Sequence, residues 1–468
     1  MNASSISPDT EPSTIEKQEV NANPEYLRCV ERVARSTDMR ACQDIYASNG
    51  IKLIASGSRI DQATWEKLTR HTLSLPLEVV LTAADPVDAM TLVRDTDQII
   101  AAEPGIAALV NRTGDPLAWK ALTGNLDLPP PLGFRFKVMR EQKRDMYHHA
   151  LRLAVLAHCI GLRLKWSGPQ LAELVLAALC HDLGEMHTDP AIFDSGRAIG
   201  VGDLRFIHVH PVTGYVILSQ TAHVPRAVAL AVLQHHERLD GSGYPHGISG
   251  ERIQPAARVL AVADLYDAVA RGGDIHRLKV ILKVEQGQLD QAVVGALKEL
   301  LPDFPDDLVP ADAPYTPAMP LTKRLHRLEQ LLGEWEALKP ALRTSVALAF
   351  VLEQVQQIQI VAWRAGMGPG FLAMFRPYTA DQQVVHELHV TLDEIDRLLT
   401  ALAARIRRRV DAGNPHWAPL MGLCENLTGK EIGQAAHTAD GELAAAAMKG
   451  PDREKRLPRS VVAACSAA

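Results

Sequence analysis

Helical periodicity between Phe134 and Leu301 constrains the fold of this chain more than any other feature. Apolar stripes at helical spacing are formed there by Leu151, Leu153, Val155 and Leu156, and again by Leu171, Leu174, Leu176 and Leu179. Alternating patterns typical of strands are almost absent from this part of the sequence. The sequence therefore predicts a mainly α protein whose core is a helical domain over residues 134–301.

A small α/β region is expected over residues 25–133. Asn49-Gly50 separates two short apolar runs and predicts a β-hairpin, because both turn positions tolerate a positive φ angle. Asp61 is expected to cap a helix that runs to about Leu73. A second helix is expected to begin near residue 85, where a proline follows an aspartate in the first turn.

Shifts in composition divide the rest of the chain. Consecutive prolines in segment 128–133 cannot lie inside a helix, so they mark the boundary before the helical domain. Residues 1–24 predict a disordered lead-in because they are polar and acidic. Residues 302–322 predict a proline-rich linker, and residues 429–468 a mobile tail.

A C-terminal helical region is expected over residues 323–428, with helices at about 323–338, 341–365 and 380–412. The last of these carries a heptad-like seam made of Val385, Leu388, Leu392, Ile395, Leu399, Leu402 and Ile406. Such a seam forms either an intramolecular bundle, which we favour, or a coiled coil that joins two chains into a homodimer.

Charge and hydropathy exclude several classes of protein. The 468 residues carry a formal net charge of -6 without a large basic block, which argues against binding to a nucleic acid polymer. The most apolar long stretch, from Val346 to Trp363, is interrupted by Glu and Gln and cannot span a bilayer. The first residues contain no apolar secretory signal, and the six cysteines form no C-x-x-C pair. We therefore expect a cytoplasmic protein with reduced thiols.

Histidines and aspartates gather between residues 145 and 264. Imidazoles and carboxylates are ligands that iron and manganese accept. Asp145 and His149 are four residues apart and therefore share one helix face. The pair His181-Asp182 ends an apolar helix, where an unpaired charge would be costly, so the carboxylate calls for a cation. Neighbouring side chains on a helix diverge by about 100°, which suits Asp182 facing two metals while His181 faces one.

Five motifs follow one another in this part of the chain. They are His149-Ala-Leu-Arg-Leu, Leu179-Cys-His-Asp-Leu-Gly184, His210-Pro-Val-Thr-Gly214, Leu233-Gln-His-His-Glu-Arg-Leu-Asp-Gly-Ser-Gly-Tyr-Pro245 and Arg258-Val-Leu-Ala-Val-Ala-Asp-Leu-Tyr-Asp-Ala268. Their order and spacing resemble those of the HD-GYP family, a helical group of HD phosphohydrolases that hydrolyse cyclic di-GMP in bacteria. The resemblance covers about a third of the chain.

The resemblance implies a two-metal centre in which His181 and Asp182 take part in catalysis, with iron or manganese as the divalent ions. Its ligands would be His149, His181, Asp182, His210, His235, His236 and Asp264. Asp145 stands where some members carry a glutamate that holds a third metal. Two cations about 3.5–4 Å apart would hold a bridging water, present it as hydroxide in line with a phosphodiester phosphorus, and stabilise the transition-state charge.

The segment from Gly241 to Pro245 is predicted to be a ligand-binding loop. Gly243, its neighbouring glycine and Pro245 predict a tight, preset loop that lets the backbone approach a ligand. Tyr244 would stack on a guanine of the substrate. Arg238 would meet a phosphate or a guanine edge; a salt bridge with Glu237 or Asp240 is an equally weighted alternative.

Two positions depart from the family pattern. Glu185 stands where many members carry a lysine that handles the phosphate or the leaving group. This charge reversal is not conservative: Glu185 would be an extra ligand or a proton donor, or it would slow turnover. Relatives grip the substrate's phosphates with an Arg-Pro-Tyr segment after the last motif, and here Arg271, Arg277 and Lys279 are the nearby cations that would replace it.

These features predict a phosphodiesterase that opens cyclic di-GMP to pGpG, or further to GMP. Two alternatives stay open. One is a signalling module that binds the nucleotide or a protein partner with little turnover, which Glu185 favours. The other is a phosphohydrolase of a mixed cyclic dinucleotide or of another nucleotide. The flanking regions are expected to be regulatory, through sensing or dimerisation.

Overall fold

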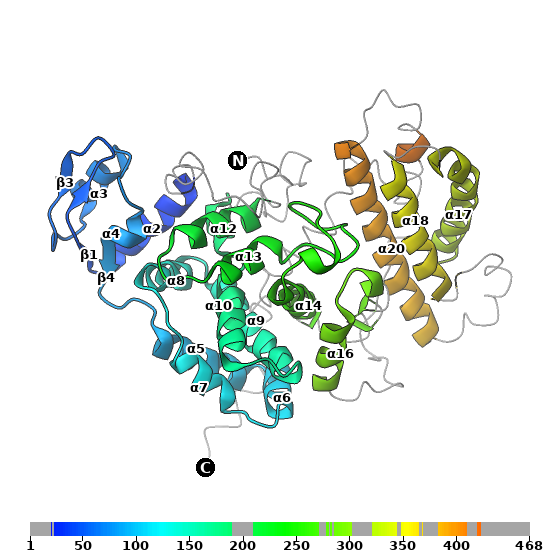
Figure 1. Cartoon of the computed structure of the whole chain (residues 1–468), viewed down its shortest axis with the longest axis horizontal. Coiled ribbons are helices and arrows are strands. Elements are labelled where there is room, and N and C mark those ends of the chain that lie inside the picture. The colour runs from blue at the N-terminus through cyan, green and yellow to red at the C-terminus, as the bar shows by residue number, and fades with distance from the viewer. Residues whose placement is uncertain are drawn as a thin grey trace, which may run out of the picture.

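The computed structural model is mainly helical, with short antiparallel sheets near the N-terminus (Figure 1). It describes residues 20, 23–189, 209–270, 278–279, 281–282, 285–301, 321–343, 348–364, 367, 382–409 and 419–422. The N-terminal strands and the C-terminal helices lie on opposite sides of a central helical domain (Figure 1). The predicted fold class is confirmed.

Short strands and helices build the N-terminal region. They are α2 (Pro24–Ser36), β1 (Met39–Ala41), β2 (Ile45–Tyr46), β3 (Lys52–Ile54), α3 (Gln62–Thr69), α4 (Leu77–Val80), β4 (Leu81–Ala83), α5 (Ala89–Ala102), α6 (Pro104–Arg112) and α7 (Ala118–Gly124). β2 and β3 pair antiparallel, and Gly50 between them has a φ of 83°, so the predicted hairpin is confirmed. β1 pairs with β4.

Helix boundaries in this region were predicted with mixed success. Asp61 caps α3 as predicted, but the helix ends at Thr69 rather than near Leu73, which forms an isolated β-bridge instead. The next predicted helix start, near residue 85, was also wrong. α5 begins at residue 89 because the carboxylate of Asp88 accepts a hydrogen bond from the backbone N–H of Thr91.

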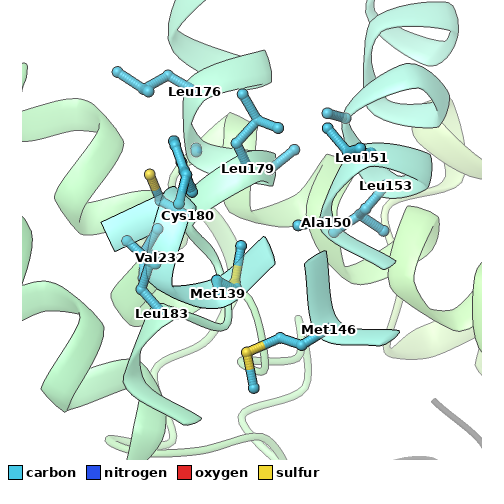
Figure 2. Packing of buried hydrophobic residues seen from close by; sticks show 14 of the residues in the cluster. Met139, Met146, Ala150, Leu151, Leu153, Leu176, Leu179, Cys180, Leu183 and Val232 are labelled. Atoms are coloured by element: carbon cyan, nitrogen blue, oxygen red, sulfur yellow. The ribbon is translucent and has the colours of Figure 1, made fainter. Parts of the chain in front are cut away.

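The central domain is a set of helices packed around α9. Its elements are α8 (Pro130–Gln142), α9 (Arg144–Arg163), α10 (Gly168–Cys180), η1 (Leu183–His187), α12 (His210–Gln220), α13 (Arg226–Gln234), η3 (Gly250–Arg252), α14 (Pro255–Ala270), η4 (Glu285–Gly287) and α16 (Gln291–Leu300). α8, α10 and α14 contact α9. Met139, Met146, Leu179 and Val232, each from a different helix, belong to one buried cluster (Figure 2).

The prolines of segment 128–133 form the first turn of α8, a position where their missing N–H is not needed. Buried side chains before and after them belong to the same cluster, which extends from Val20 to Leu301. The N-terminal region and the central domain therefore share one continuous core.

The described helices near the C-terminus form a bundle, made of α17 (Leu321–Arg343), α18 (Ala349–Arg364) and α20 (Gln382–Arg409). This C-terminal bundle has its own buried core. The seam of α20 is buried in that core from Leu388 to Ile406, so the favoured intramolecular interpretation is confirmed. The predicted lead-in, linker and tail lie almost entirely outside the described residues. None of the described helices is long and apolar enough to cross a membrane.

A buried ion pair joins the N-terminal region to the central domain. Arg135 of α8 donates to the carboxylate of Glu78 on α4, with 2.9 Å between Nε and Oε1, and the two side chains are 1% and 7% exposed. The guanidinium also lies 4.4 Å from the ring centre of Tyr26 on α2 and 3.3 Å from Nε2 of His187. The rings of Tyr26 and His187 stack, with centroids 4.9 Å apart. This cluster connects α2, α4 and α8 to η1.

Replacing Arg135 by methionine is expected to lower the free energy of unfolding by about 3–5 kcal/mol, because Glu78 is left buried without its partner. Urea unfolding followed by circular dichroism measures the change. The double variant R135M/E78L removes both charges and should recover most of the loss. Arg40→Ala, which removes an exposed pair with Asp38, should cost less than about 1 kcal/mol. An equally small loss in R135M would contradict the expectation.

Candidate metal centre

Several helix ends bring the predicted ligands to one place. These residues are His149 on α9, His181 and Asp182 after α10, His210 at the start of α12, His235 and His236 after α13, and Asp264 on α14. Four of the histidines, His149, His181, His210 and His235, are 2% exposed or less. Polar groups buried in such apolar surroundings require partners.

The carboxylate of Asp182 lies between two sets of imidazoles. Its Oδ2 is 2.9 Å from Nε2 of His181 and 3.7 Å from Nε2 of His149. Its Oδ1 is 3.4 Å from Nε2 of His210 and 3.8 Å from Nε2 of His235. The arrangement expected for a bridging carboxylate is therefore present, with one oxygen for each set.

Two groups of side chains could each hold a metal ion. One group contains Asp182, His210, His235 and His236, and the other contains His149, His181 and Asp264; within each group the ligand atoms lie within 4.8 Å of one another. Nε2 of His149 is 3.1 Å from Nε2 of His181 and 3.3 Å from Oδ1 of Asp264. Imidazole and carboxylate donors of this kind suit first-row divalent metals. The chemistry of the donor set thus fits divalent first-row metal ions.

Hydrogen bonds at the far side of the rings orient three of these imidazoles. Nδ1 of His181 donates to the carbonyl oxygen of Ala178 at 2.8 Å, and Nδ1 of His235 donates to that of Val232 at 2.7 Å. Nδ1 of His149 lies 2.7 Å from Oδ2 of Asp267. A proton on Nδ1 leaves the lone pair on Nε2, the atom that faces the centre, so each ring is held in the tautomer that binds a metal.

Asp267 is a supporting residue that the sequence analysis missed. Its carboxylate accepts from Arg152, with Nε 2.8 Å from Oδ1 and a terminal nitrogen 3.2 Å from Oδ2. Burial favours the neutral acid, but the bonds from His149 and Arg152 hold the pKa of Asp267 well below its usual range. Asp267 lies three residues after Asp264, and Arg152 three after His149. Because residues three apart share a helix face, these two spacings were the sequence signal that could have identified Asp267 and Arg152 as supporting residues.

The pKa values of the histidines in the centre are consistent with a bound cation. Burial lowers the pKa of His235 to about 3, so this ring is neutral, as a metal ligand must be. Burial also opposes a charge on His149, yet its bonds to Asp264 and Asp267 outweigh burial and raise its pKa to about 10. A metal ion would supply at His149 the positive charge that these two carboxylates favour.

Glycine at position 184 allows α12 to approach η1. A Cβ atom on Gly184 would lie 2.0 Å from the carbonyl oxygen of His210, much less than a carbon–oxygen contact permits. Gly214, one turn further on α12, is restricted in the same way, since a Cβ there would lie 2.8 Å from Cγ1 of Val232. These close approaches bring His210 to the side of the centre opposite His149.

The Gly-Tyr-Pro loop, residues 237–250, follows His236 and folds back on the centre. A Cβ on Gly243 would lie 2.4 Å from the backbone of His236 and Glu237, so only glycine fits. The ring of Tyr244 stacks on His236, with centroids 4.6 Å apart. The Glu237 carboxylate accepts from the backbone N–H of His246 and of the next residue, at 2.8 and 3.1 Å. This carboxylate therefore links the start of the loop to its later residues, 246 and 247.

Arg238, half-buried at the start of this loop, donates to the backbone carbonyl oxygen of Glu237 at 3.2 Å. The carboxylates of its two expected partners are engaged elsewhere. That of Glu237 accepts from the loop backbone, and that of Asp240 accepts from the backbone N–H of Ser242 at 2.8 Å and from Gln354.

The remaining predicted site residues lie at the edge of the centre or outside the described residues. Glu185 is half-buried in η1, and burial followed by the charge of Asp182 raises its pKa well above the ordinary value. Asp145 is exposed in the first turn of α9 and belongs to neither metal-binding group of the described residues. Arg271 lies outside the described residues.

Comparison with known proteins places an HD domain in this chain, matched over residues 137–284. A cyclic di-GMP phosphodiesterase of Pseudomonas aeruginosa is 33% identical over 123 residues, which are 26% of this chain and 30% of that protein. A cyclic di-GMP phosphodiesterase response regulator of Xanthomonas campestris is 34% identical over 119 residues, 25% of this chain and 32% of that protein. A 3′3′-cGAMP-specific phosphodiesterase of Vibrio cholerae is 29% identical over 166 residues, 34% of this chain and 36% of that protein.

The chain covers about a third of the length of each of these relatives. No solved structure matches it. The chain contains an HD domain, and the resemblance of this domain to the HD-GYP family is confirmed.

Substitution of Gly184 by alanine is expected to reduce the bound metal several-fold, because the added methyl group would push α12 and His210 away from η1. Metal content per chain, measured by plasma mass spectrometry on purified protein, tests this. Gly295→Ala is the matched control, since a Cβ at Gly295 in α16 meets nothing within 4 Å. Full metal content in G184A with an unchanged circular dichroism spectrum would count against the expectation.

Substitution of Asp267 by asparagine is expected to weaken metal affinity by about 10–100-fold, the usual effect of losing the partner of a metal-binding histidine. The amide cannot accept the same charge-assisted bond from His149. Competition for the metal with a chelator of known affinity gives the ratio. Asp115→Asn, at an exposed carboxylate far along the sequence, should leave the affinity unchanged. Equal affinity in D267N and wild type would show that Asp267 does not position His149.

Proposed function

We propose that this chain is a metal-dependent phosphodiesterase that hydrolyses cyclic di-GMP to pGpG, or further to GMP. The observation that carries the proposal is the position of Asp182, whose two oxygens each face a different pair of imidazoles. The names of relatives from Pseudomonas aeruginosa and Xanthomonas campestris support cyclic di-GMP as the substrate.

The residues of the chain would hold two divalent ions, with iron or manganese proposed because imidazole and carboxylate ligands suit both. When bound, such ions lower the pKa of water and neutralise charge on a transferring phosphate. His149, His181 and Asp264 would hold one ion, and His210, His235 and His236 the other, with Asp182 shared. Asp145 would join a third ion only if its exposed side chain turned inward along α9.

The Gly-Tyr-Pro loop is proposed to bind the nucleotide. Tyr244 would offer a guanine the ring face that His236 does not cover, while Gly243 and Pro245 keep the loop close to the centre. Arg238 is a cation at the loop's start, and Arg271 is proposed as a second phosphate-binding cation. Glu185 is proposed to hold or donate a proton beside Asp182, because its raised pKa favours the protonated acid.

Two alternatives retain specific support. A 3′3′-cGAMP-specific phosphodiesterase is among the relatives, which favours a mixed cyclic dinucleotide as a second candidate substrate. Glu185, in the place of the family's lysine, favours a module that binds nucleotide or a signalling protein with little turnover. A homodimer formed through the seam of α20 has little support, because that seam is buried within the bundle.

Protein purified anaerobically is expected to convert cyclic di-GMP to pGpG or GMP, and Asp182→Ala is expected to abolish this because it removes the group shared by both metal sites. Chromatography of the products, with metal counted per chain, measures both effects. Hydrolysis of 3′3′-cGAMP faster than that of cyclic di-GMP would make 3′3′-cGAMP the proposed substrate instead. Two bound metals without hydrolysis of either nucleotide would favour the binding module, and a chain that binds no metal would overturn the proposed chemistry.

A further inference from the structure

The C-terminal bundle contacts the Gly-Tyr-Pro loop directly. Nε2 of Gln354 on α18 donates to Oδ2 of Asp240 at 3.0 Å. The other oxygen of the same carboxylate accepts from the backbone N–H of Ser242 at 2.8 Å. Asp240 therefore ties the bundle to the backbone of the loop, and it does so between Arg238 and Tyr244.

A second contact reaches the support of the loop. Arg397 on α20 forms an ion pair with Glu285 at the start of η4, and its Nε also donates to Glu394 at 2.6 Å. The side chain of Glu285 is only 3% exposed, and that of Arg397 is 20% exposed. The charges are thus largely removed from water, and loss of Arg397 would leave the Glu285 carboxylate buried without this partner.

The backbone connects this ion pair to the loop in two steps. The carbonyl oxygen of Glu285 accepts from the N–H of Gln288 at 2.8 Å, which closes η4. The carbonyl oxygen of Gln288 then accepts from the N–H of Leu239 at 2.9 Å, and that of Leu239 accepts from the N–H of Gly250 at 3.0 Å. A shift of η4 would therefore move both ends of the loop.

Both contacts act on the same loop from different helices of the bundle. The bundle has a hydrophobic core separate from that of the central domain, so it can hold a fixed shape while its position against the loop changes. Polar and ionic contacts fix the relative orientation of two surfaces more than they add affinity, because they are strong only in one relative position of those surfaces. The hydrogen bond of Gln354 and the ion pair of Arg397 are therefore suited to fixing the conformation of the loop.

We propose that the C-terminal bundle holds the Gly-Tyr-Pro loop in its substrate-binding conformation, with Gln354 and Arg397 as positioning residues. The identity of the bound molecule rests on the proposed function, whereas the hold on the loop does not. A partner that moved the bundle away from Asp240 and Glu285 would weaken nucleotide binding and leave the metal ligands in place.

The test compares Arg397→Gln and Gln354→Leu with wild type as the full, metal-loaded chain. Arg324→Gln is the matched control, because Arg324 pairs with Asp393 and Asp396 inside the bundle. Hydrogen–deuterium exchange at Leu239, Ser242 and Gly250 reports the loop itself. Steady-state hydrolysis of cyclic di-GMP separates KM from kcat.

The expected result is faster exchange at these loop amides in R397Q and Q354L but not in R324Q. KM should rise about tenfold while kcat and metal content stay within about twofold of wild type. The double variant E285Q/R397Q, which no longer leaves the Glu285 charge buried without a partner, should show slower loop exchange than R397Q alone. Glu394 loses Arg397 in both variants, so the comparison isolates the contact with Glu285. This rescue would not follow if Arg397 only stabilised its own helix.

Unchanged loop exchange in both R397Q and Q354L would overturn the proposal whatever their activity. So would an equal effect of R324Q, since that would assign the effect to bundle stability. If R397Q does not fold, the exchange of Q354L decides alone, because this variant changes an uncharged side chain and leaves the Arg397–Glu285 ion pair in place. Faster loop exchange in a protein whose wild type hydrolyses no cyclic dinucleotide would support the positioning contact and overturn the proposed function.

Discussion

The rest of the centre depends on one carboxylate placed where a charge is costly. Asp182 follows a helix whose last residues are fully buried, and its two oxygens face imidazoles from four different segments. An isolated carboxylate there would be protonated or exposed. The half-buried carboxylate of Asp182 is therefore stabilised by positive charge, and the helices around it bring imidazoles to both of its oxygens.

The fold meets this requirement mainly through backbone approach. The contact of Gly184 with the carbonyl of His210 sets how near α12 can come, and the carbonyls of Ala178 and Val232 fix two rings by accepting their Nδ1 protons. Both acceptors lie three residues before the histidine they orient. The ends of α10 and α13 thus orient two of the rings through their backbone, whereas His149 is oriented by a side chain, that of Asp267.

The sequence predicted the helical class, the hairpin, the seam of α20 and the set of residues that meet at the centre. These follow from local periodicity and from motifs whose order resembles that of a known family. Contacts between segments far apart in the sequence could not be predicted from these patterns. Gln354 meets Asp240 across 114 positions and Arg397 meets Glu285 across 112, and no local pattern marks either pair. Asp145 shows the converse, since helical spacing places it near His149 but the start of α9 leaves it exposed.

The cluster of Arg135, Glu78, Tyr26 and His187 bears on how such a chain could be recombined with others. Its members come from α8, α4, α2 and the end of η1, so part of the support of η1 is supplied by the N-terminal region. A central domain cut out at the prolines near residue 130 would expose the Arg135 side chain, which is 1% exposed here, along with buried side chains that pack against the N-terminal region. The N-terminal region from α2 onward must therefore accompany the central domain if Arg135 and the shared core are to stay buried.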